Sequence, residues 1–500
     1  MQVMYCVSEL LDWVDVATHF EKTKKWKPSL WLTTSVNHNY VKDKFPSIDT
    51  INFYNANRGV LNKLKKEDEI ILSSKIIFKY LKYEKIALKM MDRMDPSGYT
   101  FNYSERTQLY YNILEYILNY IHSNEIDIVI FNESPHSIFT YLIYAVCVEN
   151  NIKILRLSPT HINGNTFLTS TLESKQLYLE KIYVDVRERR YISAEVEDYF
   201  SKINGQYNNA SPYYMSQIIS SNNKSDIYKI LKASVKFVKY YFKQKNRQSY
   251  TKDKSKSIRE TFSNKELART QIKRTIYKID LQKSYQKYVK QSLSDFDLNE
   301  KFIYFPLQYQ PEKSTSPEGD IFADQYLAIN MLSKVSQGRF KIYIKEHISQ
   351  FSIKLNGEQG RVSSFYEEIS LLDNIVFVST EINSFSLIDK AIAVSTITGT
   401  AGFESVIRGK PAIIFGYPWY KDCIGIFQIS DVDELKNAVD LILNKYKINI
   451  DDVKCFLQSV FQISEKIYLN NSNKNSIDDK NHNNTNSIIN LIENYEQQVL

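Results

Sequence analysis

Three groups of residues in the second half of the chain have the side chains needed to hold a phosphorylated ligand. They are Gln308–Glu312 (QYQPE), Lys345–His347 (KEH) and Ser395–Glu404 (STITGTAGFE), and each follows or ends an apolar run. A lysine and a histidine beside a glycine turn can neutralise a phosphate leaving group. His347 could also protonate or hydrogen-bond that phosphate near neutral pH. The alternative for His347 is an ordinary surface histidine at a strand end.

The third group belongs to a strand–turn–helix–strand pattern. A small-residue turn, Thr398–Gly402, separates an apolar run from a short helical pattern, and Arg408–Pro411 separates that helix from a second apolar run. This is the βαβ unit of a parallel sheet. Ligands bind where such strands end, and free N–H groups at the helix start favour phosphate. Glu404, one turn into the helix, could accept a hydrogen bond from a ribose or sugar hydroxyl; the alternative is a packing turn without a ligand.

Because all three groups come at the carboxyl ends of predicted parallel strands, we expect them to converge on one crevice. The candidate binding residues are Gln310, Glu312, Lys345, His347, Ser395, Thr398, Gly399, Thr400 and Glu404. His347 is also a candidate catalytic residue.

A fourth group, Asn132–His136, follows a predicted strand in the first half of the chain, Asp127–Asn132. Glu133 in this group is a candidate catalytic residue, the general base that would act on an acceptor hydroxyl. The same residues also fit a helix start, with Ser134 as the N-cap and Pro135 at the first helical position.

Two carboxylates flank Arg93 in the segment Met91–Pro96 (MDRMDP), which ends a long helical pattern predicted over Glu67–Met91. Asp95–Pro96 is typical of a helix stop. This segment is either a second candidate for catalysis or a local charge network.

The histidines and cysteines form no recognisable metal or redox motif. The seven histidines include no HxxxH or HExxH pair, and the four cysteines have no CxxC spacing, so no metal site is expected. Cys6 and Cys147 lie in apolar runs and are expected to be buried thiols, which fits a reducing cytoplasm. We find neither a signal-peptide pattern nor an uncharged apolar run of about 18 residues, so no transmembrane helix is expected.

Strands and helices alternate in two separate parts of the 500 residues, which predicts an α/β protein with two Rossmann-like domains. Two such domains facing a cleft are the architecture of GT-B glycosyltransferases and of nucleotide-sugar 2-epimerases, in which the carboxyl-terminal half holds the nucleotide. The predicted domains are an acceptor-side domain (1–174), a basic and mainly helical insert (175–299), a nucleotide-sugar-binding domain (300–447) and a C-terminal part (448–500). That last part is predicted as a helix over Val453–Tyr468, an Asn-rich linker and a helix from Ser487.

Several of these segments resemble the bacterial capsule polysaccharide biosynthesis family, which includes the Kdo transferases that build the lipid-linked primer of capsules. The resemblance is carried by Phe305–Ser314 (FPLQYQPEKS), Lys345–His347, Thr398–Glu404 and Phe415–Asp422 (FGYPWYKD). Met91–Glu105 and Asn132–His136 resemble related surface-carbohydrate proteins. The resemblance covers about residues 90–160 and 300–425 and leaves the basic insert unaccounted for.

The resemblance implies a GT-B enzyme whose nucleotide-sugar donor is a substrate, with no further cofactor. A Gln-Pro-Glu element and a His-Pro element line the donor site in the family. Gln310–Glu312 matches the first, whereas Ile348 replaces the proline after His347. Because the family includes users of CMP-activated sugars, CMP-Kdo or another CMP-activated acid sugar is the leading donor. No Asp-x-Asp element ends a predicted strand, so transfer is expected to be metal-independent.

The net charge of +7 is unevenly distributed. The segment Lys224–Lys290 carries 20 Lys or Arg against 5 Asp or Glu, and the rest of the chain is mildly acidic. Within it, Ile227–Lys243 has the pattern of a basic amphipathic helix. This helix could lie on an anionic membrane, pack its apolar face on the protein, or bind another polyanion. No nucleic-acid partner is expected, because no nucleic-acid-binding module accompanies the charge.

The sequence therefore predicts a cytoplasmic, membrane-peripheral glycosyltransferase that acts on a bacterial surface or capsular polysaccharide or on its lipid-linked primer. Its partners would be a nucleotide-sugar donor and a glycan or glycolipid acceptor. Two alternatives remain open. An epimerase of the same fold would convert its nucleotide sugar without an acceptor, and a non-catalytic protein for polysaccharide assembly or export would bind no nucleotide.

Overall fold

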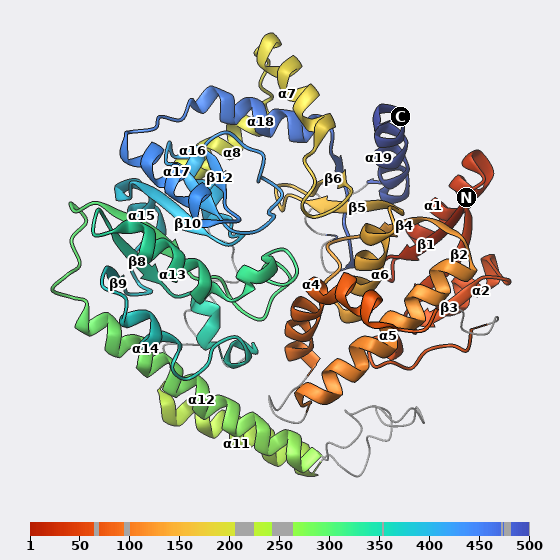
Figure 1. Ribbon diagram of the computed structural model, residues 1–500, viewed down its shortest axis with the longest axis horizontal. Helices are drawn as coiled ribbons and strands as arrows, with labels where there is room; N and C mark the ends of the chain where they lie inside the picture. Colours follow the sequence, from red (N-terminus) through yellow and green to blue (C-terminus); the bar gives the residue numbers. More distant parts are fainter. Residues whose placement is uncertain are drawn as a thin grey trace. The chain divides into compact units, whose positions relative to one another are not determined.

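The computed structural model describes residues 1–64, 70–94, 101–205, 225–242, 264–352, 355–471, 474 and 482–499. The chain forms two compact units (Figure 1). Unit 1 consists of Met1–Met91, Phe101–Arg190 and Leu457–Leu500. Unit 2 consists of Tyr191–Phe456 together with a short segment that begins at Asp92.

Unit 1 is built on a seven-stranded sheet in the order β13-β6-β5-β4-β1-β2-β3. The pairs among β1 to β5 are parallel, and β6 is antiparallel to both β5 and β13. The strands are β1 (Gln2–Cys6), β2 (Lys27–Thr33), β3 (Asp49–Asn52), β4 (Ile126–Phe131), β5 (Lys153–Pro159), β6 (Asn165–Thr169) and β13 (Glu465–Lys466). The helices are α1 (Asp12–Lys24), α2 (His38–Lys44), α3 (Phe53–Ala56), α4 (Ser74–Met90), α5 (Tyr103–Ser123), α6 (Ile138–Glu149), α7 (Leu177–Arg189) and α19 (Asn484–Val499).

Unit 2 is built on a six-stranded sheet in the order β12-β11-β10-β7-β8-β9, in which every neighbouring pair is parallel. The strands are β7 (Phe302–Pro306), β8 (Lys341–Lys345), β9 (Ile375–Phe377), β10 (Ala393–Thr396), β11 (Ala412–Ile414) and β12 (Ile426–Gln428). Its longer helices are α8 (Ala194–Asn204), α11 (Asp226–Phe242), α12 (Asn264–Gln291), α13 (Gln325–Ser336) and α17 (Val432–Leu443). Shorter ones are α14 (Phe365–Ser370), α15 (Ser384–Lys390), α16 (Ala401–Ile407) and the 3-10 turns η3 (Asp320–Ala323), η4 (Ile348–Phe351) and η5 (Gly357–Gln359).

The chain passes between the units at several points, one of which lies between Arg190 at the end of α7 and Tyr191. The 3-10 turn η1 (Met91–Met94) leaves unit 1, and α18 (Ile450–Gln462) carries the chain from unit 2 back to it. Residues 457–499 then complete unit 1, because β13 pairs with β6 and α19 packs on α1.

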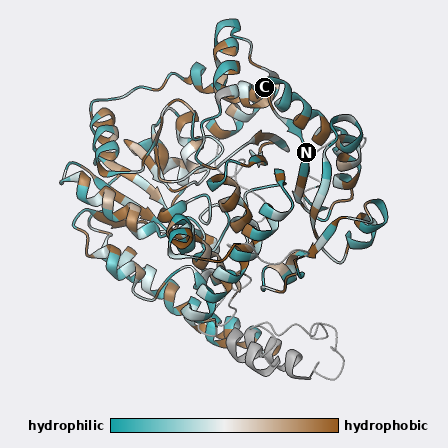
Figure 2. Ribbon diagram, turned by 45° about the vertical axis from the view of Figure 1, so that its right-hand side comes forward, coloured by the Kyte–Doolittle hydropathy of each residue, from teal (hydrophilic) through white to brown (hydrophobic). Residues whose placement is uncertain are grey.

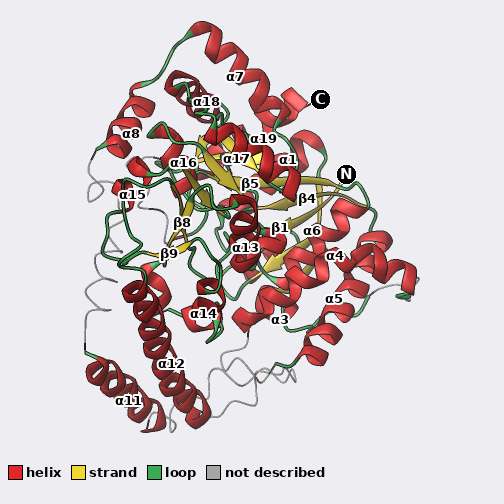
Figure 3. Cartoon of the chain, turned by 60° about the vertical axis from the view of Figure 1, so that its left-hand side comes forward, coloured by secondary structure: helices red, strands yellow, loops and turns green. Residues whose placement is uncertain are grey.

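Each sheet is covered by apolar helix faces that form a core of its own (Figure 2). In unit 1, Trp31 stacks on Tyr5 with 4.5 Å between ring centroids, beside the buried Trp13 of α1. In unit 2, α12 lies against α11 (Figure 3). Its Tyr285 and Tyr288 belong to the core and contact Phe377 of β9. Burial of these side chains is the main source of stability in each unit.

The predicted α/β class with two Rossmann-like sheets is confirmed, and so is the burial of Cys6 and Cys147, which are free thiols. The helix α6 was predicted over Ser137–Glu149, and it begins at Ile138 with Ser137 as its N-cap, so the alternative of a helix start at Ser134 and Pro135 is excluded. One other helix prediction was wrong at its end. The predicted helix Val453–Tyr468 ends at Gln462, because the chain turns there into β13.

Two other predictions fall partly outside the described residues. Residues 65–69, where the helix Glu67–Met91 was predicted to begin, are not described, and α4 starts at Ser74. Asp95–Pro96 and Lys243 also lie outside the described residues.

Candidate functional site

The carboxyl ends of β7, β8 and β10 form one edge of the unit 2 sheet, and the predicted groups follow these strands. Gln308 comes after β7, Glu346 after β8 and Thr398 after β10. The chain places β8 and β9 on one side of β7 and β10 to β12 on the other. The strand order therefore reverses between β7 and β10, the point at which open parallel sheets bind ligands.

A side-chain amide joins the two strand ends at this reversal. Gln308 Oε1 accepts a hydrogen bond from the Thr398 backbone N–H at 2.8 Å, and Gln308 Nε2 donates to Thr398 Oγ1 at 3.1 Å. Thr398 Oγ1 in turn donates to the Ser314 carbonyl. Thr398 thus holds the turn after β10 against the loop after β7.

The turn between β10 and α16 is tightly packed around Gly399. Its N–H donates to Thr396 Oγ1 at 3.2 Å, and its carbonyl accepts from the Tyr420 hydroxyl. A Cβ on Gly399 would lie 2.8 Å from Thr396 Oγ1, so this position requires glycine. Ser395, one strand residue earlier, is fully buried, and its Oγ has no hydrogen-bond partner in the described part of the chain.

Thr400 and Glu404 flank the start of α16, a helix of seven residues. Thr400 is exposed and Glu404 is half-buried. Burial raises the pKa of Glu404, and a hydrogen bond from Thr400 and the charge of Arg408 oppose that rise. Glu404 therefore lies in the first turn after β10 and accepts a hydrogen bond from Thr400, and its role toward a ligand stays a prediction.

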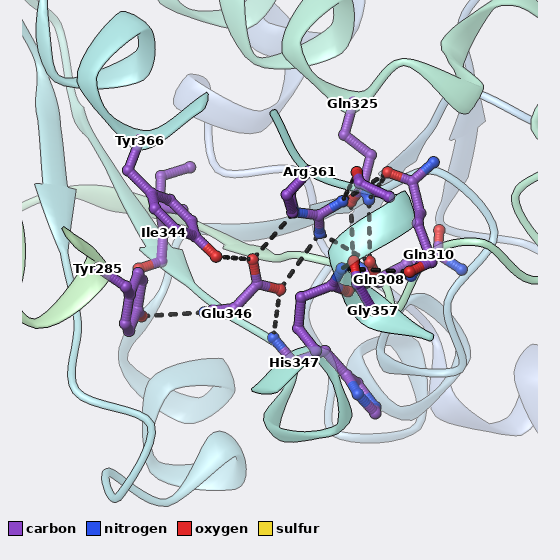
Figure 4. A network of polar contacts seen from close by, with 12 residues as sticks. Tyr285, Gln308, Gln310, Gln325, Ile344, Glu346, His347, Gly357, Arg361 and Tyr366 are labelled. Atoms are coloured by element: carbon purple, nitrogen blue, oxygen red, sulfur yellow. Dashed lines mark hydrogen bonds and ion pairs between the residues drawn. The ribbon is translucent and has the colours of Figure 1, made fainter. Parts of the chain in front are cut away.

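Beneath the β8 end lies a fully buried ion pair between Glu346 and Arg361 (Figure 4). Arg361 Nε lies 3.0 Å from Glu346 Oε2, and Arg361 Nη2 lies 3.2 Å from Oε1. Tyr366 donates to Oε2 at 2.6 Å, and the His347 backbone N–H donates to Oε1 at 2.7 Å. Burying a charge this completely is tolerated only when it is paired and hydrogen-bonded, and here both carboxylate oxygens have two donors each.

The remaining donors of Arg361 extend this network to the β7 end. Nη2 donates to the Gln308 carbonyl at 2.9 Å, and Nη1 donates to Gln310 Oε1. Gln325 Nε2 donates to the same two acceptors, each at 2.9 Å, and Gln350 Nε2 donates to the Gln310 carbonyl at 3.1 Å. Gln310 is therefore buried within the network, where it fixes the loop that leads to Glu312.

Lys345 and His347 flank Glu346 and point to different partners. Burial lowers the pKa of Lys345 to about 8, and its ammonium donates to the Ile382 carbonyl and, at 2.9 Å, to Ser384 Oγ. Burial lowers the pKa of His347 to about 4, so the ring is neutral at pH 7. Its Nδ1 accepts from the Ser349 N–H at 3.2 Å and caps η4. The neutral His347 ring can therefore hydrogen-bond a ligand, and a bound phosphate would favour the protonated ring.

The loop after β7 brings Glu312 close to Arg93. Glu312 is exposed, and Ser314 Oγ donates to its Oε2 at 3.1 Å. Arg93 Nη2 donates to the Ser316 carbonyl at 2.7 Å. Burial lowers the pKa of Arg93 to about 10, and the charges of Glu312 and Asp92 oppose that effect. The MDRMDP segment therefore contributes its arginine to unit 2.

In unit 1, Glu133 follows β4. Its Oε1 lies 3.8 Å from His136 Nδ1, and that nitrogen lies 3.1 Å from the Ser134 carbonyl. Ser134 Oγ accepts from the buried Arg156 of β5 at 3.0 Å. Sequence reasoning missed Arg156, which is hidden in an otherwise apolar strand pattern.

Unit 2 also contains residues that sequence reasoning missed, chiefly Arg361, Gln325 and Tyr366. Arg361 lies in the loop before α14 and Gln325 at the start of α13, and neither belongs to a motif. In the described ranges, no group of three or more His, Cys, Asp or Glu is arranged to hold a metal ion. No helix among the same residues is long and apolar enough to cross a membrane.

Comparison with known proteins gives a family match over residues 206–438, to the model described as capsule polysaccharide biosynthesis protein. No curated protein matches the sequence.

Solved structures that resemble the chain include two transferases of the Thermosulfurimonas dismutans protein KpsC. The beta Kdo 2,4 transferase has 14% identity over 36% of this chain and 55% of that chain, with a TM-score of 0.23. The beta Kdo 2,7 transferase has 11% identity over 76% and 89%, with a TM-score of 0.28. A glycosyltransferase from Rickettsia africae has 12% identity over 99% and 97%, with a TM-score of 0.24. The match to the first of these spans little more than half its length, and all three TM-scores are too low to support a function.

Proposed function

We propose, from the match of residues 206–438 to the capsule polysaccharide biosynthesis family, that the protein is a glycosyltransferase that uses a nucleotide-activated sugar. The acceptor is a bacterial surface or capsular polysaccharide or its lipid-linked primer. The sugar transfer takes place in the cytoplasm, at the inner face of the membrane, where such a primer is available.

One observation carries this proposal. The family match covers α11, α12 and the elements from β7 into α17, and within it three polar groups meet at the reversal of strand order in a parallel sheet. The Gln308–Thr398 amide bridge holds two of these groups together, and the Glu346–Arg361 pair anchors the third. A lysine, the start of a helix and an acceptor carboxylate at one edge of the sheet suit a sugar nucleotide.

Within this site, the turn from Thr398 to Thr400 and His347 would receive the phosphate, and Glu404 would accept from a ribose or sugar hydroxyl. Because the pKa of Lys345 is lowered to about 8, its ammonium group can share a proton with the leaving phosphate as negative charge develops there. In the reaction, an acceptor hydroxyl oxygen bonds to the anomeric carbon while the bond from that carbon to the phosphate oxygen breaks. We propose Glu133 as the base that takes the hydroxyl proton.

A CMP-activated acid sugar of the Kdo type is the proposed donor, because the family that the sequence resembles includes users of CMP-activated sugars and Gln310–Glu312 matches its Gln-Pro-Glu element. A thermal-shift screen of CMP, UDP and GDP tests this. A ligand at 100 times its dissociation constant adds about 2.7 kcal/mol to the free energy of unfolding. We expect CMP to give the largest shift, and no shift with any nucleotide would contradict the proposal.

The same screen, repeated with two variants, tests the site. Thr400→Ala and Glu404→Ala each remove a hydrogen bond to a charged or polar ligand group, so nucleotide affinity should fall about tenfold or more. Ser370→Ala in α14 is the control, since its hydroxyl bonds the Glu367 carbonyl. Incubating the donor without acceptor separates transfer from epimerisation, because only an epimerase converts its substrate alone.

We also propose that transfer needs no metal ion, since the N–H groups and lysine of the site can stabilise the leaving phosphate. Activity should then survive EDTA. Loss of activity on chelation, with recovery after adding magnesium or manganese, would contradict this part of the proposal.

A further inference from the structure

The helix α11 packs against its neighbour with the polar side that an amphipathic helix normally shows to water. α11 runs antiparallel to α12, since Lys229 near its start meets Gln282 near the end of α12, with 3.2 Å between Nζ and Oε1. Asp226 Oδ2 lies 3.1 Å from Lys283 Nζ in the same region. Lys229 is only 3% exposed. The contact between the two helices is therefore made partly by charged and amide groups.

The apolar residues of α11 are exposed instead. Ile227, Leu231 and Val235 are spaced by four residues, so they lie on one face, and they are 72%, 59% and 54% exposed. Lys229 falls two residues from each of the first two and therefore lies on the opposite face. We call the exposed set the α11 stripe; its members are Ile227, Tyr228, Ile230, Leu231 and Val235. The expectation that this helix packs its apolar face on the protein is wrong for these residues.

We propose that the α11 stripe is a docking surface for an anionic lipid membrane. An exposed row of large apolar side chains on a helix is costly in water and fits a surface with an apolar interior. The segment Lys224–Lys290 around it carries 20 basic and 5 acidic residues, which complements negatively charged headgroups. Lys232 borders the stripe, and its Nζ lies 5.8 Å from the centre of the Tyr228 ring.

Charge also argues against a second copy of this chain as the occupant. Pairing two α11 stripes would bring two strongly basic segments together, and like charges in contact oppose association. A lipid surface matches both the charge and the apolar side chains of this segment. Its headgroups attract the lysines, and its acyl region accommodates the α11 stripe. Because α11 carries lysines along its length, it would lie along the surface and not across it.

Docking would deepen the proposed function by holding the enzyme beside a lipid-linked acceptor, and in that sense it rests on that function. The test is co-sedimentation with phosphatidylcholine vesicles that contain phosphatidylglycerol, compared with phosphatidylcholine alone. We expect binding to the anionic vesicles that weakens as salt screens the charges. Ile227→Asp with Leu231→Asp should weaken binding at least tenfold. Lys232→Glu should weaken it about 30-fold, because one favourable charge is lost and one unfavourable charge is added.

Leu371→Asp is the matched control, since Leu371 is equally exposed in unit 2 but lies outside α11. It should bind vesicles like the wild type. Equal binding to neutral and anionic vesicles, or none to either, would overturn the proposal. So would a dimer in analytical ultracentrifugation that the double aspartate variant abolishes. Nucleotide affinity is measured on the same samples, so failure of docking is distinguished from failure of the proposed transferase activity.

Discussion

Arg361 is the residue on which most of the buried polar groups around the site depend. It pairs with the carboxylate of Glu346 and also donates to Gln308 and Gln310, so a single guanidinium links the ends of β7 and β8. The site can depend on the residues of this network even if none of them contacts a ligand. Its role is to fix the backbone from which Thr398 and His347 project.

We expect Arg361→Met to lower the free energy of unfolding by about 3–5 kcal/mol, because Glu346 would be left as a buried charge without its partner. Denaturant unfolding measures this. The control is Glu300→Gln, which removes an exposed ion pair with 2.8 Å between Lys341 Nζ and Glu300 Oε2 and should cost less than about 1 kcal/mol. A similar loss in the free energy of unfolding for the two variants would show that the buried pair contributes no more than the exposed one.

His347 makes the stability of unit 2 depend on pH. Its pKa in the folded protein is about 4, below the value of about 6.5 in an unfolded chain. Below about pH 6.5 the unfolded chain therefore binds a proton that the folded protein does not, and the free energy of unfolding falls as pH approaches 4. Above about pH 6.5 the contribution is complete.

The variant His347→Asn isolates this effect, because asparagine can still accept from the Ser349 N–H but cannot titrate. Urea unfolding between about pH 7 and about pH 4.5 should show a shallower loss of stability in the variant than in the wild type. Parallel curves would mean that His347 does not titrate in this range.

At the residue scale, sequence could locate the site but not assign the roles within it. The ends of β7, β8 and β10 are readable from apolar runs, so Gln308–Glu312, Lys345–His347 and the glycine turn were expected together. Which of these side chains are buried depends on partners from irregular loops, and no periodic pattern marks Arg361. Gln310 was expected to bind the ligand. Its side chain is buried inside the network, and its role toward a ligand stays a prediction.

At the scale of elements, the glycine turn shows how closely β10, α16 and the following loop pack. Gly402 lies in the first turn of α16, where alanine would normally stabilise a helix by about 1 kcal/mol. Here a Cβ would lie 2.6 Å from the hydroxyl of Tyr420, which is almost fully buried and donates to Gly399. The ordinary propensity rule is therefore expected to fail.

Gly402→Ala should lower the free energy of unfolding by about 1–3 kcal/mol, the usual cost of overpacking. In a Tyr420→Phe background the same change should cost less, because the nearest remaining ring atoms are 3.2 Å away. A double-mutant cycle by denaturant unfolding gives the coupling. Independent effects of the two substitutions would contradict this packing.

The elements that sequence could not predict are those that depend on distant partners. β6 and β13 are short, and β13 has only two residues, so neither shows a clear alternation. β13 exists because it pairs with β6 across some 300 residues of sequence, whereas β6 also pairs with the neighbouring β5. The outward orientation of α11 was equally unreadable, because a helical pattern shows which face is apolar but not which face packs.

At the scale of the whole molecule, unit 1 is assembled from both ends of the described chain. Its core includes five apolar side chains from the tail, Ile467, Leu469, Ile488, Leu491 and Ile492. Each such side chain contributes about 1.5–3 kcal/mol when buried. Together they match the roughly 5–15 kcal/mol by which a typical domain is stable.

A chain that ends at Gln462 should therefore fail to fold unit 1 while retaining unit 2. Limited proteolysis should leave a protected fragment within Tyr191–Phe456 and digest the first 190 residues. The matched control is the full chain, in which both parts should resist. Protection of both units in the shortened chain would show that the tail is dispensable. The two α/β halves were predictable from their alternating patterns, and in GT-B proteins the chain often returns to the first half through terminal helices. Which residues of the tail contact which strand was not predictable, since nothing in the tail marks its partner.

This discontinuity has a consequence for biosynthesis. On the ribosome, most of unit 1 emerges first, yet the strand and helix that complete it are made only after all of unit 2. At about 5–20 residues per second, the nascent sheet waits for tens of seconds with the edge of β6 unpaired and the tail-binding part of its core uncovered. Open edges and apolar surfaces of this kind invite association with other chains. The order of synthesis thus makes the folding of this protein dependent on cellular factors that shield nascent chains. This dependence increases with the number of chains that are synthesised at the same time.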